Sequence, residues 1–492
     1  MEQILTSGKR FLDECGRERI FNGINMVDKE ELRPGGEKVN FNVPQDDEFY
    51  KKLKELGFNL IRLGFTWSAV EPQPGKYNEE FLDNVGKVLD KCAENGIYAF
   101  LDMHQDLYSG FGLGVGDGAP AWACLTDGYK AHPHKIVWAE GYFWGRAVQH
   151  AYDNFWKNTQ YNGRGLLDWY ADMWKHVSDK FKNHPALFGF DLLNEPYPGI
   201  VGGKIFRTLV ANLVKVTLTD KRIKKGKLIK DALSKNNKAR VFEQYGSGIL
   251  ETVTSSAASL VEKFDTERYS PFLNKVSTSI RENTEKGIIF IDDCYYSNLG
   301  IMCCAKNIEV NGGKEPLTCY GPHAYDFMVD TPLYKYASSD RVTFMFDQHK
   351  KAQERLNVPV VVGEWGGFSE GTDWFPHVEY LLSLYDRNKW SNTFWCYFDG
   401  LLDLPLMDVL TRPYPRAVTG EIVAYSHDRE AGTFTLEYTQ DKKFKEPTVI
   451  FLHKPAVSVE TDGKYEIEQI SNGAAVLKVK TQPGTHKIVV KF

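Results

Sequence analysis

The chain has 492 residues, of which 42% are hydrophobic and 25% charged, and its formal net charge is −5. This length suits one large barrel with a small appended domain, and the composition is that of a soluble globular protein. Because there is no overall basic surplus, the totals argue against a nucleic-acid-binding protein.

The start of the chain, "MEQILTSGKRFLDECG", lacks the continuous apolar block of a secretory signal, and no run approaches 18 consecutive apolar residues. The eight cysteines are few for this length, and the adjacent Cys303 and Cys304 are poor partners for each other. We therefore expect reduced thiols and a cytoplasmic protein, or a secreted one if a signal has been removed. No CxxC pair or HExxH motif is present, so we expect neither a metal nor another cofactor.

Eight short runs rich in β-branched and aromatic residues alternate with longer helical patterns. Such alternation is typical of βαβ units, and eight of them predict an α/β fold, a (β/α)8 TIM barrel over residues 1–412. In chain order the runs are "IFNGIN" from 20, "FNLIRL" from 58, "IYAFLDM" from 97, "LFGFDLL" from 187, "GIIFID" from 287, "LTCYG" from 317, "VPVVVG" from 358 and "NTFWCYF" from 392.

A large insertion separates the fourth and fifth runs, at about residues 200–286. Its first part, "KIFRTLVANLVKVTL", has an apolar face that carries Ile205, Phe206, Leu209, Val210 and Leu213. Six lysines or arginines then follow within residues 221–230. The 200–230 segment could contact an anionic membrane surface. The alternative, which we favour, is a lid helix over the barrel with a solvated charged tail.

After about Arg412 the pattern changes to short alternating runs separated by turn residues, such as "TFTLEYTQ", "PTVIFLHK" and "HKIVVKF". Strict alternation predicts strands with one buried face. We therefore expect an antiparallel β-sandwich domain over residues 413–492.

Chemically capable side chains follow most of the predicted barrel strands. Because active sites of this fold collect at the C-terminal ends of the strands, we expect these side chains to converge. They are Arg62 after the second run, Asp102, His104 and Asp106 after the third, Asn194 and Glu195 after the fourth, His323 and Tyr325 after the sixth, Glu364 after the seventh and Trp395 in the eighth.

Glu195 and Glu364 form the candidate catalytic pair. They are 169 residues apart in sequence, but the fourth and seventh strands of a closed barrel place their ends across one mouth. Glycoside hydrolysis with retention needs two carboxyl groups roughly 5 to 5.5 Å apart. A single glutamate could instead bind an arginine and hold a loop, but two at strand ends favour catalysis.

The motifs "RLGFTW", "LNEP", "GPHAYD", "GEWG" and "FWCYFDG", in this order over about 400 residues, resemble the retaining clan A glycoside hydrolases of family five. The resemblance implies that Glu195 is the acid/base and Glu364 the nucleophile. It further implies that Asn194 binds the sugar 2-hydroxyl, that Arg62 and Tyr325 hold Glu364 ionised, that His104 and His323 shape the subsite and that Trp395 stacks under the sugar. The alternatives are packed core histidines and a tryptophan that fills the barrel.

The stretch "DMHQDLYSGFG" and the contexts "LNEPYPG" and "RPYPRAVTG" resemble the endoglycoceramidase and glycosylceramidase-like subgroup, whose members cut between a sugar and a ceramide. The resemblance implies that Asp102, His104 and Asp106 line the sugar subsite, although Asp102 could instead orient His104. Ile205, Phe206 and Leu209 on one side and residues 401–407 on the other could wall an apolar trough for the lipid, or could simply be packing.

Three hypotheses follow. The first is a retaining β-glycosidase that acts on a glycolipid or on another hydrophobic glycoside, such as a sterol or flavonoid conjugate. The second is an endo-glycanase of the cellulase or mannanase kind, which calls for an open cleft with several exposed tryptophans, whereas the insertion predicts a covered site. The third, a non-catalytic sugar-binding protein, should have lost one of the two carboxylates.

Overall fold

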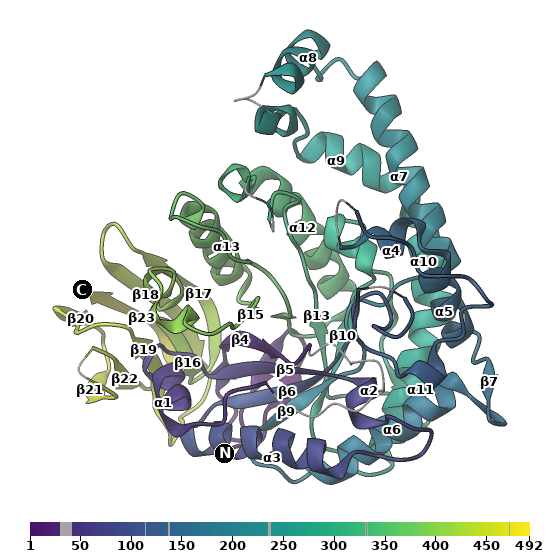
Figure 1. The fold of residues 1–492 in the computed structure, drawn as a ribbon. Coiled ribbons are helices and arrows are strands. Elements are labelled where there is room, and N and C mark those ends of the chain that lie inside the picture. Colours follow the sequence, from purple (N-terminus) through teal and green to yellow (C-terminus); the bar gives the residue numbers. More distant parts are fainter. Residues whose placement is uncertain are drawn as a thin grey trace.

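The computed structural model describes residues 1–29, 42–113, 115–135, 138–234, 238–329, 331, 333–471 and 473–492. Eight parallel strands lie in the spatial order β13-β10-β9-β6-β5-β4-β15-β14, and parallel bridges from Tyr320 to Val360 and from His323 to Glu364 close the sheet into a barrel. The TIM barrel is thus confirmed (Figure 1). The strands are β4 (Asn22–Val27), β5 (Leu60–Thr66), β6 (Tyr98–His104), β9 (Leu187–Asp191), β10 (Ile288–Asp292), β13 (Thr318–Gly321), β14 (Val361–Val362) and β15 (Ser391–Phe394).

Helices surround the barrel, and several begin at a side chain that caps them. Asp46, Asn78 and Ser338 each accept a hydrogen bond from the backbone N–H three residues later, which satisfies a donor that the helix itself leaves unpaired. These helices are α1 (Asp47–Glu55), α2 (Trp67–Val70), α3 (Glu79–Asn95), α4 (Glu140–Trp144), α5 (Arg146–Trp156), α6 (Leu166–Phe181), α12 (Ser339–Leu356), α13 (Phe375–Asn388) and α14 (Met407–Leu410). The last helix of the 200–286 insertion, α11 (Ser270–Arg281), packs beside α6.

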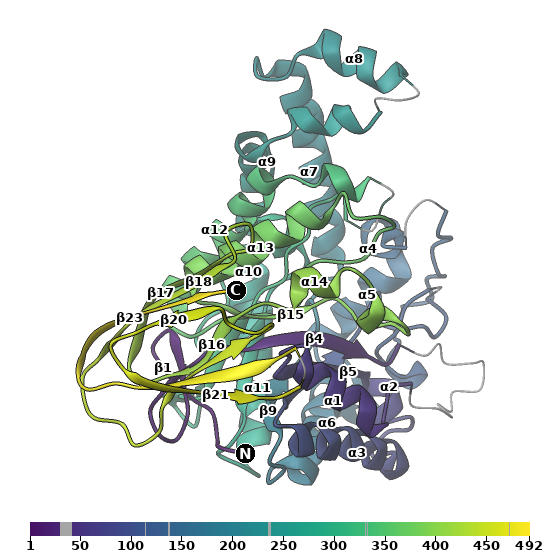
Figure 2. The ribbon, with the colours of Figure 1, turned by 90° about the vertical axis from the view of Figure 1, so that its left-hand side faces the viewer.

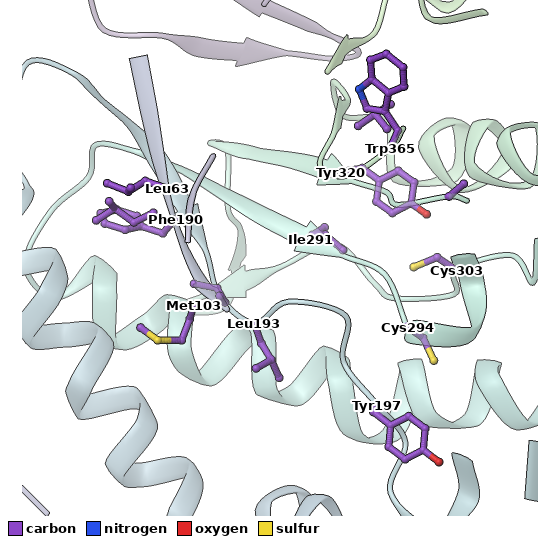
Figure 3. Packing of buried hydrophobic residues seen from close by; sticks show 14 of the residues in the cluster. Leu63, Met103, Phe190, Leu193, Tyr197, Ile291, Cys294, Cys303, Tyr320 and Trp365 are labelled. Atoms are coloured by element: carbon purple, nitrogen blue, oxygen red, sulfur yellow. The ribbon is translucent and has the colours of Figure 1, made fainter. Parts of the chain in front are cut away.

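The side chains on the two faces of each barrel strand belong to different clusters. Outward side chains such as Leu63, Met103, Phe190 and Ile291 belong to the main hydrophobic cluster, part of which Figure 3 shows. A separate cluster contains Phe100, Phe188 and Phe290 together with Phe11 from the N-terminal segment. Since side chains alternate along a strand, Phe100 on β6 is followed on the same face by Asp102 and His104. An aromatic layer therefore lies beneath a polar layer at the carboxyl ends of the strands.

The first part of the insertion, from α7 to α9, projects beyond the barrel on the side where those carboxyl ends lie (Figures 1 and 2). No helix in the described ranges is both long enough and apolar enough to cross a bilayer. The insertion contains α7 (Ile200–Thr219), α8 (Lys225–Leu233), a 3-10 segment (Lys238–Gln244), α9 (Ser247–Thr254), another 3-10 turn (Ser255–Ala257), α10 (Ala258–Phe264) and a π-helical turn (Asp265–Tyr269).

Antiparallel strands form the C-terminal domain, as the sequence predicts. A four-stranded sheet has the order β17-β18-β23-β20, and a seven-stranded sheet has the order β1-β2-β3-β16-β19-β22-β21, so the first strands of the chain join this domain. The strands are β1 (Leu5–Ser7), β2 (Arg10–Leu12), β3 (Glu18–Arg19), β16 (Tyr414–Val418), β17 (Glu421–Asp428), β18 (Thr433–Gln440), β19 (Thr448–Leu452), β20 (Ser458–Glu460), β21 (Lys464–Gln469), β22 (Ala475–Lys480) and β23 (Gly484–Lys491). The remaining strands have two residues each and form two hairpins, β7–β8 (Gln160–Tyr161, Arg164–Gly165) and β11–β12 (Glu309–Val310, Gly313–Lys314).

Candidate active site

The structure brings Glu195 and Glu364 together at the carboxyl end of the barrel. One oxygen of each carboxyl group and one ring nitrogen of His323 all lie within 4.8 Å of one another. Glu195 is 6% exposed and Glu364 is 5% exposed. This proximity fits the separation of roughly 5 to 5.5 Å between the carboxyl groups of retaining enzymes better than the roughly 6.5 to 9.5 Å of inverting enzymes.

Arg62 connects the members of the polar layer. Its Nη1 donates to Glu364 Oε1 at 2.6 Å, and its Nη2 donates to Asp191 at 2.9 Å and to Asn194 Oδ1 at 2.8 Å. The guanidinium also lies 3.0 Å from Asp102 and is fully buried. Several carboxylates therefore share one cation, which is unusual unless some of them are neutral.

Glu364 is held through both of its oxygens. While Arg62 donates to Oε1, the Tyr325 hydroxyl donates to Oε2 at 3.0 Å. The two donors together fix the plane of the carboxyl group. Glu364 is therefore oriented as a nucleophile has to be.

Glu195 has a different environment. Its backbone has a φ of 43°, in the left-handed region, and its N–H donates to Asp292 Oδ2 at 3.1 Å. Such a conformation costs about 1–3 kcal/mol and is typical of functional sites. Burial and the nearby Asp106 carboxylate raise the pKa of Glu195 to about 7, which suits a proton donor near neutral pH.

His323 lies between the two glutamates. Its Nδ1 is 3.0 Å from Glu195 Oε1 and 3.7 Å from Glu364 Oε2. Burial lowers the pKa of His323 to about 3, so the ring is neutral, and the carboxylates favour the tautomer with its proton on Nδ1. The neighbouring Gly363 leaves room for the ring, because a Cβ there would lie 2.6 Å from His323 Nε2.

His104, Asp106 and Trp395 lie together beside the carboxylate pair. The His104 ring stacks on Trp395 with centroids 5.5 Å apart, and its Nδ1 is 2.8 Å from Asp102. Although burial and the Lys29 ammonium oppose protonation, Asp102 and Asp106 raise the pKa of His104 to about 9. Asp102 itself is fully buried behind His104, so its contacts fit the orienting role better than direct sugar contact.

Lys29 is a charged group that the sequence reasoning missed. Its ammonium contacts Asp106 and lies 4.7 Å from the centroid of the Trp395 ring. His104, Asp106 and Asp117 also offer three potential ligand atoms within 4.8 Å, but the Lys29 ammonium already provides a cation to this cluster. We assign no metal to it.

An open cavity of about 1030 Å³ begins at Glu195, Glu364 and the neighbouring polar side chains and continues under the insertion. Ile205 and residues 401–407 do not line it, and so the predicted trough is wrong in these parts. Ile205, Leu401 and Leu406 are fully buried in the core, which is the packing alternative. The apolar walls come from Phe206, Leu209, Val210, Leu213, Ile249 and Val253 of the insertion and from Phe327, Met328 and Val329 after β13.

The sequence model described as cellulase (glycosyl hydrolase family 5) matches residues 21–220 and 251–400, and that of the glycoside hydrolase family 5 C-terminal domain matches residues 412–490. The chain belongs to glycosyl hydrolase family 5. The predicted family is thus confirmed. Residues 221–250, which include the basic cluster and α8, lie outside the match.

Among individual proteins, the endoglycoceramidase of Cyanea nozakii is 35% identical over 214 residues, which cover 39% of this chain and 41% of that protein. The endoglycoceramidase of Hydra vulgaris is 33% identical over 216 residues, or 39% and 40% of the two chains. These matches thus span about two fifths of the relatives' length. Endo-glycoceramidase II from Rhodococcus sp. has a similar fold, with a TM-score of 0.73 at 23% identity over 99% of both chains.

Proposed function

We propose that this protein is a retaining β-glycosidase that cleaves the bond between a sugar and a hydrophobic aglycone, namely the lipid of a glycolipid. The observation that carries the proposal is the cavity: the carboxylate pair lies at one end of it, and apolar side chains line the rest. Polar groups with fixed orientation suit a sugar, and an apolar trough suits a lipid tail. The names of the two endoglycoceramidase relatives support the same substrate class.

The proposed reaction has two displacements. Glu364 attacks the anomeric carbon while Glu195 donates its proton to the oxygen of the departing aglycone. When Glu364 becomes an ester its negative charge is lost, and Glu195 can then ionise and accept a proton from the incoming water. That water cleaves the ester, releases the sugar and restores both glutamates.

An endo-glycanase is the competing function. Its substrate would need sugar-binding surfaces on both sides of the carboxylates, whereas the aglycone side here carries Leu209, Val210 and Leu213. Lipid release from glucosylceramide and lactosylceramide in detergent micelles, compared with reducing ends released from carboxymethylcellulose, tests the choice. Turnover of the glucan alone would overturn the proposal.

We also propose that the 200–230 segment contacts an anionic membrane surface. Residues 200–234 contain nine lysines and arginines but only two aspartates. Leu218, Ile229 and Leu233 are 61%, 60% and 80% exposed, and α8 stands away from the barrel (Figure 2). Basic residues interspersed with exposed aliphatic residues favour contact with anionic lipid headgroups.

Vesicle sedimentation tests this contact. We expect binding to phosphatidylcholine vesicles only when they contain phosphatidylserine, and its loss in a variant with Lys221, Lys224 and Lys225 all changed to Glu. The matched control changes Lys442, Lys443 and Lys445, which are exposed in the C-terminal domain, to Glu. Equal binding by both variants, or equal loss in both, would contradict a specific role of the insertion.

A further inference from the structure

Asn298 contacts the proposed acid/base but does not come from any of the motifs that carry the family resemblance. It lies in the 3-10 turn Tyr295–Leu299 that follows β10, and its Nδ2 donates to Glu195 Oε1 at 2.5 Å. The side chain is buried, since Asn298 is only 8% exposed. A short hydrogen bond to a buried carboxyl group affects the two protonation states of that group differently.

Two hydrogen bonds fix the start of the turn, directly before Asn298. The backbone N–H of Tyr295 donates to the carbonyl of Pro196, the residue after Glu195, at 3.2 Å. The Tyr296 hydroxyl donates to the carbonyl of Gly202 in α7 at 2.7 Å. Asn298 is therefore held against Glu195 by the backbone that carries Glu195 and by the first turn of the insertion.

Asn298 and His323 meet the same oxygen of Glu195. Both contacts, at 2.5 and 3.0 Å, are to Oε1, so Oε2 has no hydrogen-bond partner among the described residues. An amide N–H and a neutral imidazole N–H can only donate, and a protonated carboxyl group keeps its acceptor oxygen on that side. The proton of Glu195 is consequently directed to Oε2.

We propose that Asn298 is a positioning residue that places the Glu195 proton on Oε2 and keeps Glu195 able to ionise in the second displacement. Burial and Asp106 favour the neutral form of Glu195, and a donor at Oε1 opposes them. Without Asn298, Glu195 would still donate its proton in the first displacement, but it would ionise less readily as a base. The inference rests on the proposed function, because it assigns Glu195 the acid/base role.

The test is the pH profile of Asn298→Ala on a hydrophobic glycoside that the wild-type enzyme cleaves. Since the Asn298 amide favours the ionised form of Glu195, we expect the alkaline limb of kcat/KM to move upward by about one to two pH units when it is removed. The limb for Asn298→Gln, which keeps the amide, should move less. Ser297→Ala, in the same turn, should leave the limb unchanged because Ser297 Oγ has no hydrogen-bond partner among the described residues.

A second measurement does not depend on turnover. In protein labelled with carbon-13 at the glutamate carboxyls, the Glu195 resonance, assigned by its absence in Glu195→Gln, should titrate at higher pH in Asn298→Ala than in wild type. The inference would be overturned if Asn298→Ala lowered the maximal kcat/KM but shifted neither the alkaline limb nor the titration of the Glu195 resonance. The glycosidase function would then still stand. Lack of any glycosidase activity in the wild type would instead overturn the proposed function.

Discussion

Arg62 and Glu364 are joined across the mouth of the barrel by a hydrogen bond of 2.6 Å between Nη1 and Oε1. The two residues are 302 positions apart in the sequence, and both are almost completely buried. Because Tyr325 holds the other oxygen, the Glu364 carboxylate has one fixed orientation. A nucleophile fixed in this way does not lose rotational freedom when the substrate arrives.

Replacement of Glu364 by Gln should therefore abolish turnover. The amide is not a nucleophile, and losses on the order of 10⁴-fold or more are expected when a nucleophile is removed. With Glu364→Gly and an aryl β-glycoside, added azide should restore product as a glycosyl azide of inverted anomeric configuration. Glu370→Gln, an exposed glutamate after the same strand, is the control. Near-normal rates for Glu364→Gln would remove Glu364 from the mechanism.

Glu195→Ala should discriminate between substrates by their leaving groups. A dinitrophenyl glycoside departs without a proton, whereas a lipid alcohol needs one, and general acid catalysis contributes roughly 10²–10⁴-fold. We thus expect that first-displacement rates measured in single turnovers fall by about this factor for the glycolipid and fall little for the dinitrophenyl substrate. Losses of similar size on both substrates would contradict the acid role.

The barrel and most of the site could be predicted because they depend on local pattern. On β6 the alternation of side chains places Phe100, Asp102 and His104 on one face, and this alternation can be read directly from the sequence. The family resemblance, rather than spacing, supplied the distinct roles of Glu195 and Glu364.

Two residues of the site were not predicted, and one wall of the cavity was misplaced. Lys29 follows the first strand, so the rule that selected the other strand-end residues could have found it. Asn298 lies six residues beyond the end of β10 in a 3-10 turn, where no periodic signal exists. The second wall of the trough was misplaced because the apolar stretch at 401–407 packs into the core, while residues 327–329 face the cavity.

The pH dependence should follow the protonation of Glu195. Burial and Asp106 raise the pKa of this group to about 7, and the donated proton is present only below that value. For a glycolipid, kcat/KM should be level below about pH 7 and fall roughly tenfold per pH unit above it. A dinitrophenyl glycoside should lack this alkaline limb. If both substrates have the same limb, its origin is a group other than Glu195.

The trough should determine the affinity for the lipid rather than the chemistry at the sugar. Leu213 lines the cavity, whereas the adjacent Val214 is 53% exposed and does not line it. Burial of a leucine-sized surface contributes about 1.5–3 kcal/mol, so Leu213→Ser should raise KM for glucosylceramide in micelles roughly tenfold or more. The same substitution should leave a short-chain aryl glycoside almost unaffected, because that substrate does not extend under α7. Val214→Ser provides the matched control, and an equal effect of the two substitutions on the micellar substrate would indicate that α7 contributes stability rather than lipid contact.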